Sequence, residues 1–359
     1  MKTLALVMIV KNEERCLERC LECVKGLVDD IYITDTGSTD RTVEIAKKFG
    51  AHVSRFDWCG DFSAARNFSL QQSGCDWNLI LDADEYLVSG TREDIREFME
   101  KGDAAGAIHR LDSFVGDSGE VCRGNTFTTR LVPSGSIYKG RVHEQVVSDL
   151  PVRPVPLVFE HDGYMQGGKG ERNLQILMED YEEAPEDSYV LYQIAYTLWN
   201  MKRYEEADPW FEKFYKLVPK SGTGYRPAGV VAYLYNLLQL KRYEEGLAMI
   251  DREKEKMDLY ADFHFACGTF YTQAIFSDVQ RYVSLLPEIE KSYLKCLEVG
   301  EVPEQGGVWG NGSFKAAYNL GVWCEVNGNQ QKALAWYRQA LDQGYTPAGE
   351  RIEKILQKN

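Results

Sequence analysis

Four short apolar runs in the first quarter of the chain are each followed directly by a polar cluster. This pattern limits the fold more than any other feature. The runs lie at residues 3–10, 31–34, 52–56 and 77–81. Apolar runs of this length, bounded by turn residues, are typical of buried strands. We predict helices at residues 13–25, 41–49, 63–72 and 91–101. Strands that alternate with single helices predict an α/β fold on a mostly parallel, doubly wound sheet.

Each polar cluster comes where one of these strands ends. The clusters are Lys11–Glu13, Asp35–Asp40, Asp57–Asp61 and Asp82–Glu85. Parallel strands share one carboxyl edge, and ligands bind at that edge in open α/β sheets. The sequence therefore predicts a ligand site built from these four clusters.

The pattern changes beyond about residue 104. We predict further strands at residues 104–115, 126–132, 143–147 and 155–159, as an extension of the first domain. From about residue 171 the chain has a helical pattern throughout. The sequence thus predicts an α/β domain over residues 1–170 and an all-α domain over residues 171–359.

The helical half contains a loose internal repeat. The sequence Lys202–Ala207 (KRYEEA) recurs as Lys241–Gly246 (KRYEEG). The first and last units resemble tetratricopeptide repeats at Ala195, Ala207, Phe211 and Pro219, and at Leu320, Gly321, Ala333, Tyr337 and Ala340. Helical hairpins of this kind stack to bury an apolar stripe. Such an array binds a peptide or protein, braces the first domain or forms a homodimer, and the sequence leaves these alternatives open.

Composition excludes several classes of protein. With 55 acidic and 41 basic residues, the formal charge of −14 argues against a nucleic-acid partner, which needs an excess of Lys and Arg. There is no signal-peptide pattern and no apolar run long enough for a membrane helix, so we expect a cytoplasmic protein. The nine scattered cysteines fit a reducing compartment, and Cys16, Cys20 and Cys23 mark a buried helix face. Motifs of P-loop kinases, esterases and zinc proteases are absent from the sequence.

Two carboxylates separated by one small residue, Asp82 and Asp84, follow the fourth strand. On an extended chain, side chains two residues apart point the same way, so these charges repel unless a cation lies between them. Mg²⁺ and Mn²⁺ prefer oxygen ligands and bind through one or two carboxylates together with substrate phosphates. The pair therefore predicts a divalent-metal site.

The cluster after the second strand has the sequence Asp-Thr-Gly-Ser-Thr-Asp. Gly37 allows a tight turn and the close approach of a ligand. Asp40 is a natural cap for the helix that follows. Asp35 ends the strand and is not explained by capping, whereas its carboxylate can accept the ring N–H of a nucleotide base.

Four ordered motifs resemble those of family 2 glycosyltransferases of the GT-A fold. They are Val10-Lys11-Asn12-Glu13-Glu14, Asp35-x-Gly37-Ser38-x-Asp40, Asp61-Phe62-Ser63-x-x-Arg66-Asn67 and Asp82-Ala83-Asp84-Glu85. The resemblance spans about residues 3–165. It is closest to the lipopolysaccharide-core glucosyltransferase-like branch and to the bacteriocin S-glycosyltransferases that carry helical repeats. It implies a Rossmann-like sheet, a UDP-sugar donor and a Mn²⁺ or Mg²⁺ cofactor.

The resemblance also implies the residues that bind the nucleotide. Val10 with Asn12 or Glu13 would line the pocket for uracil and ribose, and Asp35 would contact the uracil ring. These roles agree with the position of all four residues where the first two predicted strands end.

The resemblance also implies which charged residues contact the metal and the diphosphate of the donor. By resemblance, Asp84 would ligate the metal, and Asp82 would touch the ribose or the water shell of the metal. Arg66 would approach the nucleotide or its diphosphate, which agrees with the need for a guanidinium beside an anionic ligand. The alternative for Arg66 is a structural ion pair with Asp61 or Asp57.

Two further motifs carry the remaining candidates. Inverting sugar transfer needs a base for the acceptor's proton, and either Glu144 or His143 is a candidate because the family branch has a similar Val-His-Glu here. Better-known relatives have a Glu-Asp pair instead. A third possibility is therefore that neither Glu144 nor His143 is the base. The resemblance extends to His161-x-Gly163-Tyr164, where His161 is a third metal ligand, a diphosphate donor or a structural histidine.

These observations favour an inverting, metal-dependent glycosyltransferase that moves a sugar from a UDP-sugar to a peptide, protein or glycan acceptor. A second interpretation is a non-catalytic scaffold that binds partners through its helical repeats. A third is a sugar nucleotidyltransferase, which normally has a Gly-rich loop with Arg and Lys after the first strand, where this chain has Lys11-Asn12-Glu13.

Overall fold

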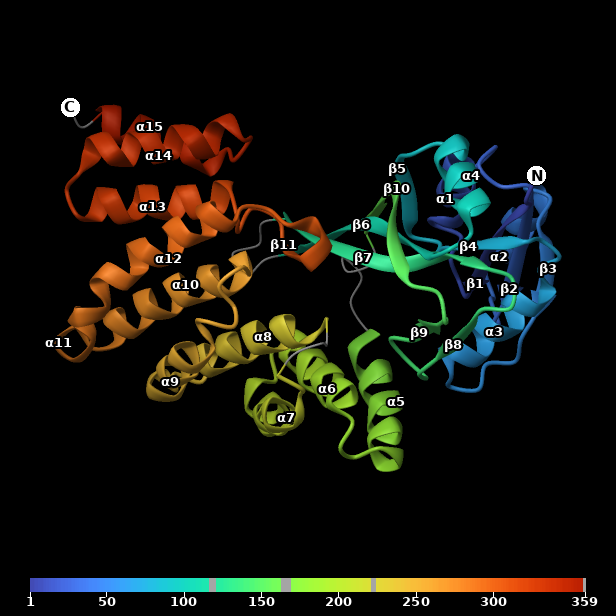
Figure 1. Cartoon of the computed structure of the whole chain (residues 1–359), viewed down its shortest axis with the longest axis horizontal. Coiled ribbons are helices and arrows are strands. Elements are labelled where there is room, and N and C mark those ends of the chain that lie inside the picture. The colour runs from blue at the N-terminus through green and yellow to red at the C-terminus, as the bar shows by residue number, and fades with distance from the viewer. Residues whose placement is uncertain (116–120, 163–168, 221–223, 358–359) are drawn as a thin grey trace. The chain divides into compact units, whose positions relative to one another are not determined.

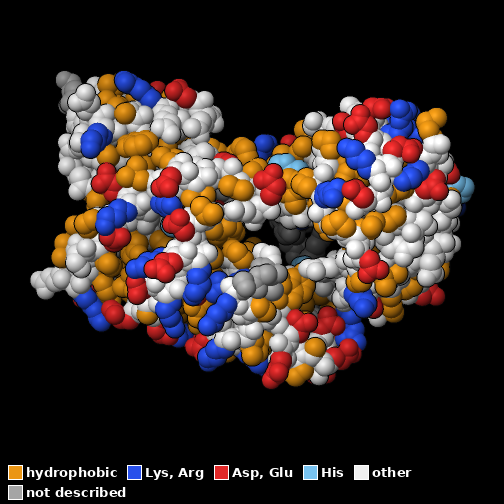
Figure 2. Space-filling view, viewed as in Figure 1, with side chains coloured by type: hydrophobic (Ala, Val, Ile, Leu, Met, Phe, Trp, Pro, Cys, Tyr) orange, Lys and Arg blue, Asp and Glu red, His pale blue; other side chains and the backbone are white. Residues whose placement is uncertain are grey.

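The computed structural model describes residues 1–115, 121–162, 169–220 and 224–357. The chain forms two compact units, residues 1–183 and 184–359 (Figure 1). Within the described ranges, no helix combines the length and apolar character that a membrane crossing requires. On the face drawn in Figure 2, acidic and basic side chains are interspersed, as is usual for a well-solvated surface.

The first unit is built on a mixed, mostly parallel sheet. Its strands are β1 (Leu4–Val10), β2 (Asp30–Asp35), β3 (His52–Arg55), β4 (Trp77–Ile80), β5 (Glu85–Ser89), β6 (Ala105–Val115), β7 (Val121–Pro133) and β10 (Val152–His161). Their order along the sheet is β3-β2-β1-β4-β7-β6-β10-β5. The first four are parallel, as predicted, whereas β7 pairs antiparallel with both β4 and β6. Strands β8 (Ile137–Lys139) and β9 (Gln145–Val147) form a separate two-stranded sheet.

Helices cover both faces of the sheet because successive side chains of β1 point to opposite sides. The helices of this unit are α1 (Leu17–Cys23), α2 (Thr42–Lys48), α3 (Phe62–Gln72), α4 (Arg92–Lys101) and α5 (Lys169–Glu183). Leu6 and Met8 belong to the main core with residues of α1, α2 and α4. Ala5 and Val7 pack with Leu70 of α3 on the other side. The buried Cys16 and Cys20 lie in the main core, as predicted, and all nine cysteines are free.

The division between the units falls later than the boundary we predicted at 170/171. Helix α5 belongs to the first unit by its contacts. Arg141 pairs with Asp180 and Glu183 of α5, and Arg172 lies over the ring of Phe62. The helical pattern of residues 169–183 thus continues into the second unit, while the helix packs with the first.

The second unit is all-helical apart from short segments. Its helices are α6 (Ser188–Asn200), α7 (Tyr204–Leu217), α8 (Arg226–Gln239), α9 (Tyr243–Glu253), α10 (Ala261–Ser277), α11 (Val279–Tyr282), α12 (Leu286–Val299), α13 (Phe314–Val326), α14 (Gln330–Asp342) and α15 (Pro347–Gln357), with 3₁₀ turns at Val283–Leu285 and Pro303–Gln305 and a two-residue strand β11 at Gly307–Val308. The tetratricopeptide-like pattern is confirmed by packing. Ala195, Ala207 and Phe211 are fully buried. A Cβ on Gly321 would lie 2.5 Å from the Tyr337 ring, so this helix crossing needs glycine.

Three turns between paired helices share one backbone conformation. Lys202, Lys241 and Gly328 occupy the same position in these turns, with φ values of +59°, +57° and +75°. In each turn the next residue donates its N–H to a carbonyl near the end of the preceding helix, at 3.0, 2.9 and 2.8 Å. A left-handed φ is strained for lysine and free for glycine. The turns of the repeat therefore keep the same backbone geometry even though lysine stands at two of these positions and glycine at the third.

This equivalence predicts opposite effects of exchanging lysine and glycine. We expect Lys241→Gly to raise the free energy of unfolding by about 0.5–1 kcal/mol, because it relieves the left-handed backbone. Gly328→Lys should lower it by a similar amount, since space is open there but the backbone is strained. Thermal denaturation measures both. Lys291→Gly inside α12 is the matched control and should destabilise. Destabilisation by Lys241→Gly would contradict the shared turn.

Two acidic side chains hold the glycine-rich segment 300–313: Asp262 ties it to α10, and Glu301 closes it on itself. Asp262 accepts hydrogen bonds from Val308 N at 2.9 Å and from Asn311 Nδ2 at 2.8 Å. Glu301 accepts from the N–H groups of Gly310 and Gly312 at 3.0 and 3.1 Å. Burial raises the pKa of Asp262 to about 6, against the hydrogen bonds that favour its charged form. The segment is thus held by a carboxylate that is costly to ionise.

The raised pKa of Asp262 gives a pH-dependent term in stability. The folded-state value of about 6 exceeds the unfolded value, so this stability is present at low pH and is lost as pH rises from about 4 to about 6. In Asp262→Asn that loss disappears, and the free energy of unfolding relative to wild type should increase by up to about 3 kcal/mol between pH 4 and pH 7. Urea denaturation at both pH values measures the difference. A constant difference would contradict the shifted pKa.

Candidate active site at the carboxyl edge of the parallel strands

The loops after β1 and β2 are joined by hydrogen bonds into one structure. Asn12, at φ +57°, donates its N–H to Ser38 Oγ at 2.9 Å, and its Oδ1 accepts from Thr39 N at 2.8 Å. Glu13 N donates to Thr42 Oγ1 at 2.7 Å. The strained backbone at Asn12 is therefore held by both loops. This arrangement brings together two of the clusters predicted to bind a nucleotide.

Asp35 lies beside Val10 at the ends of β2 and β1. Its carboxylate closes the following turn by accepting from Gly37 N at 3.2 Å and Ser38 N at 3.1 Å, and Gly37 has φ +108°. A carboxylate has about four acceptor sites, so this leaves Asp35 able to bind a further donor. The Val10 side chain is buried, and its carbonyl accepts from Thr36 N at 2.9 Å.

Asp40 has the structural role that its capping position indicated. Its carboxylate accepts from Thr42 N at 2.9 Å and Glu14 N at 3.1 Å. Burial opposes ionisation, but these hydrogen bonds hold the pKa of Asp40 below its ordinary value. The residue therefore fixes the start of α2.

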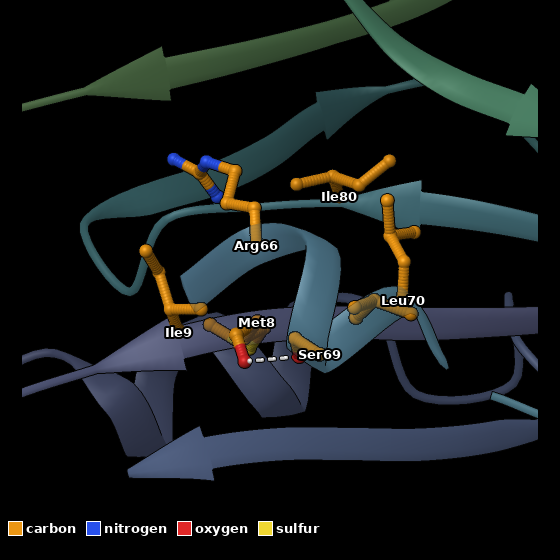
Figure 3. Close-up of a pocket in the computed structure, with 7 residues that line it drawn as sticks. Met8, Ile9, Arg66, Ser69, Leu70 and Ile80 are labelled. Atoms are coloured by element: carbon orange, nitrogen blue, oxygen red, sulfur yellow. Dashed lines mark hydrogen bonds between the residues drawn. The ribbon is translucent and has the colours of Figure 1, made fainter. Parts of the chain in front are cut away.

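Arg66 reaches the sheet edge from α3. Asp61 caps this helix by accepting from Ala64 N at 2.9 Å, and Ser69 ties it to β1 through a 3.1 Å hydrogen bond to the Met8 carbonyl (Figure 3). In Figure 3 the guanidinium rises from α3 beside Ile9, at the wall of a tight internal gap. Because Asp61 is occupied by capping, it does not pair with Arg66.

The partners of Arg66 are two residues of the predicted site. Arg66 Nη2 lies 2.7 Å from Asp82 Oδ1, and Arg66 Nε pairs with Glu144. The arginine is 6% exposed, and its Nη1 has no hydrogen-bond partner. Two carboxylates from distant parts of the chain thus converge on one buried guanidinium. The alternative pairing with Asp61 or Asp57 is wrong: Asp57 is exposed and lies beside Arg55.

A second buried arginine, Arg130 of β7, was not recognised in the sequence. Its Nη2 lies 2.6 Å from Asp82 Oδ2 and 2.8 Å from Glu85 Oε1. Glu85 is fully buried and also accepts from Arg110 Nη1 at 3.1 Å. Burial opposes ionisation of Asp82, but Arg130 and Arg66 hold its pKa well below the ordinary range. The sequence signal for this residue was an arginine inside a predicted strand. A buried charge needs a partner, so such an arginine indicates a nearby carboxylate.

In the described part of the chain, Asp84, the second carboxylate of the Asp-x-Asp motif, contacts His161 rather than an arginine. Its Oδ1 lies 3.5 Å from His161 Nε2, and His161 Nδ1 lies 2.8 Å from Asp112 Oδ1. Burial opposes protonation of His161, but hydrogen bonds to Asp112 and Asp84 raise its pKa to about 9. Asp112 is held in turn by Arg110 Nε at 2.7 Å. His161 is therefore oriented by one carboxylate toward another.

These contacts form one chain of alternating charges. Its order is Glu144, Arg66, Asp82, Arg130, Glu85, Arg110, Asp112, His161 and Asp84. Each carboxylate between two cations has its desolvation offset by both neighbours. The chain links the candidate base, the Asp-x-Asp motif and the late histidine in a single network.

Asp84 and His161 fit a divalent cation as a two-residue donor set. A metal-binding histidine commonly has its second nitrogen bonded to a carboxylate, as His161 has with Asp112. Substrate phosphates supply further ligands in such sites. Asp82 is engaged by two arginines, and among the residues described no group of three or more His, Cys, Asp or Glu side chains is arranged for a metal. Asp82 thus lies in the network rather than beside the other two.

The two candidate bases lie in very different surroundings. Glu144 is largely buried against Arg66, and taking up a proton would weaken that ion pair. His143 has an exposed side chain and a left-handed backbone with φ +53°. Residues 163 and 164 of the His-x-Gly-Tyr motif lie outside the described residues.

The chain is similar in sequence to several known proteins. Residues 5–146 match the model for glycosyl transferase family 2. A TPR repeat-containing protein of Synechococcus elongatus is 32% identical over 274 residues, 70% of this chain and 65% of the relative. An uncharacterized glycosyltransferase of Rickettsia typhi is 37% identical over 95 residues, 26% of this chain and 32% of the relative. The SPbeta prophage-derived glycosyltransferase SunS of Bacillus subtilis is 27% identical over 226 residues, 59% of this chain and 53% of the relative.

The sheet and the family match together define an α/β domain of the glycosyl transferase family 2 type, followed by a helical repeat domain. The first unit carries a glycosyl transferase family 2 domain, which confirms the resemblance of its four motifs. The chain spans less than two thirds of the length of each of these relatives.

Removal of Arg130 tests the buried network. Arg130→Met leaves Asp82 and Glu85 without their shared cation, and should lower the free energy of unfolding by about 3 kcal/mol. Adding Glu85→Gln should recover part of that loss, because it removes the most deeply buried charge. Chemical denaturation measures both variants. Arg153→Met, which breaks an exposed pair with Asp103, is the control and should cost less than about 1 kcal/mol. Equal losses in the two arginine variants would contradict a buried network.

Proposed function

We propose that the protein is an inverting, metal-dependent glycosyltransferase that moves a sugar from a UDP-sugar to a peptide, protein or glycan acceptor. The observation that carries the proposal is the convergence of Asp35, Arg66 and Asp84 on the carboxyl edge of parallel strands in a family 2 domain. In sheets of this class, that edge is the ligand-binding edge.

The donor-side roles follow from charge and position. Asp35 accepts the ring N–H of uracil, and the joined loops at Asn12 and Gly37 shape the nucleoside pocket. Arg66 has a buried, unpartnered Nη1, which supplies a hydrogen bond to an anionic diphosphate. Asp84 and His161 would hold the divalent cation. Such a cation neutralises the charge that develops on the departing diphosphate.

Transfer requires one bond exchange at the anomeric carbon. The acceptor nucleophile attacks that carbon from the face opposite the diphosphate, the carbon–oxygen bond to the phosphate breaks, and UDP leaves with the bonding electrons. Glu144 takes the proton of the acceptor. Arg66 balances the negative charge that develops on the departing diphosphate. His143, the preceding residue of the same loop, is the second candidate for the base.

The alternatives make different use of the same residues. A non-catalytic scaffold requires neither the Asp84–His161 pair nor a buried arginine nitrogen without a partner. A nucleotidyltransferase normally has a Gly-rich loop with Arg and Lys after β1, where this chain has Lys11 followed by Asn12 and Glu13, both joined to the neighbouring loop. The repeats of the second unit fit a peptide or protein acceptor, and glycan transferases carry such repeats as well.

Asp84 is the residue whose loss separates these interpretations. We expect Asp84→Asn to lower metal-dependent turnover of a UDP-sugar at least 100-fold, because it weakens the electrostatic stabilisation of the leaving diphosphate. The measurement is UDP release over a panel of UDP-sugars with Mn²⁺ or Mg²⁺. Asp103→Asn, at an exposed carboxylate, is the control. Full activity in Asp84→Asn would exclude the metal role, and no binding heat with UDP and Mn²⁺ in wild type would favour the scaffold.

A further inference from the structure

Helix α5 holds the loop that carries Glu144, although it lies beyond the residues that match the family model. We propose that Arg141, anchored by Asp180 and Glu183 of α5, is a positioning residue for Glu144. This inference rests on the proposed function, since it concerns the candidate base of the same site.

The anchor is a forked ion pair. Arg141 Nη1 lies 3.1 Å from Asp180 Oδ1, and Arg141 Nη2 pairs with Glu183. The side chain of Asp180 is 18% exposed and that of Arg141 is 29% exposed. A guanidinium with two carboxylate partners is fixed in direction as well as in place. The anchor therefore restrains the loop more than a single surface ion pair does.

The same loop is attached to α3 at two points. The Arg141 carbonyl accepts from Phe62 N at 2.8 Å, at the first residue of the helix. Three residues later, Glu144 pairs with Arg66, one turn further along α3. Arg172 of α5 also lies over the Phe62 ring, 5.1 Å from its centroid. Helices α5 and α3 thus hold the loop between them.

The backbone of this loop explains why it needs an anchor. Gly140 has φ +97° and His143 has φ +53°, so two left-handed residues bracket Arg141 and Val142. A non-glycine residue in this conformation persists only where its surroundings enforce it. Val142 is buried and holds the centre of the segment. Without the pull of α5 on Arg141, the turn at His143 relaxes and Glu144 loses its fixed position.

The consequence is specific to turnover. The nucleoside contacts at Asp35 and the Asp84–His161 pair lie on other elements and do not depend on Arg141. Arg66, which pairs with Glu144, is also held by Asp82 and so keeps its place when the loop loosens. Loosening the loop therefore affects the proton-accepting step and leaves donor binding in place. A residue that served only general stability would change both together.

The test compares Arg141→Gln, Arg141→Lys and Asp180→Asn with the control Arg153→Gln, which breaks the exposed Arg153–Asp103 pair. In Arg141→Gln we expect kcat for UDP-sugar turnover to fall at least tenfold, with less than a threefold change in KM for the donor and in the Kd of UDP with Mn²⁺. Arg141→Lys should recover part of kcat, because an ammonium still reaches one carboxylate. Asp180→Asn should give an intermediate loss, and the control should equal wild type.

Hydrogen exchange supplies a readout that does not need activity. Amides of residues 140–146 should exchange at least tenfold faster in Arg141→Gln than in wild type, with no change in β1 or β2. Unchanged exchange, unchanged kcat, or a loss of kcat in step with UDP binding would each overturn the positioning role. A wild-type protein that neither binds UDP nor turns over a UDP-sugar would instead overturn the proposed function, while the exchange data would still decide whether α5 anchors the loop.

Discussion

The sharing of Asp82 between two buried arginines is the interaction on which the site edge depends. Arg66 comes from a helix and Arg130 from an antiparallel strand, so one carboxylate joins α3 to the sheet at this point. Buried charges are tolerated only as networks in which each member is paired. That requirement fixes Glu85 and Glu144 on either side of the pair, and it brings the loop at 140–144 to the end of the parallel strands.

Much of the first unit could be predicted because its signals are local. Each parallel strand is a compact apolar run, and β1, β2, β3 and β4 were placed within a residue or two of their observed ends. Strand β5 was missed because Glu85–Ser89 follows the acidic cluster without a break. Its pairing with β10 is a contact between residues far apart in sequence. The antiparallel insertion of β7 beside β4 is non-local in the same way.

The site was predictable in its members and not in its connections. The end of each strand identified Asp35, Asp82 and Asp84, and the structure gathers them at one edge. The sequence contained no sign that Asp82 faces two arginines, because Arg130 comes from β7, which joins the sheet only in three dimensions. The helical half shows the reverse case. Its turns keep one backbone geometry although lysine replaces glycine at two of three equivalent positions.

The place where the first compact unit ends bears on how the family 2 domain can be separated from the rest of the chain. A fragment cut after the portion that matches the family model, at about residue 146, or at the predicted boundary near residue 170, keeps Arg141 and discards both of its acidic partners. It also exposes Phe62 where Arg172 covered it. A fragment that keeps the first compact unit whole therefore runs through Glu183, and the helix that looks like the start of the repeat array is the last structural element of that unit.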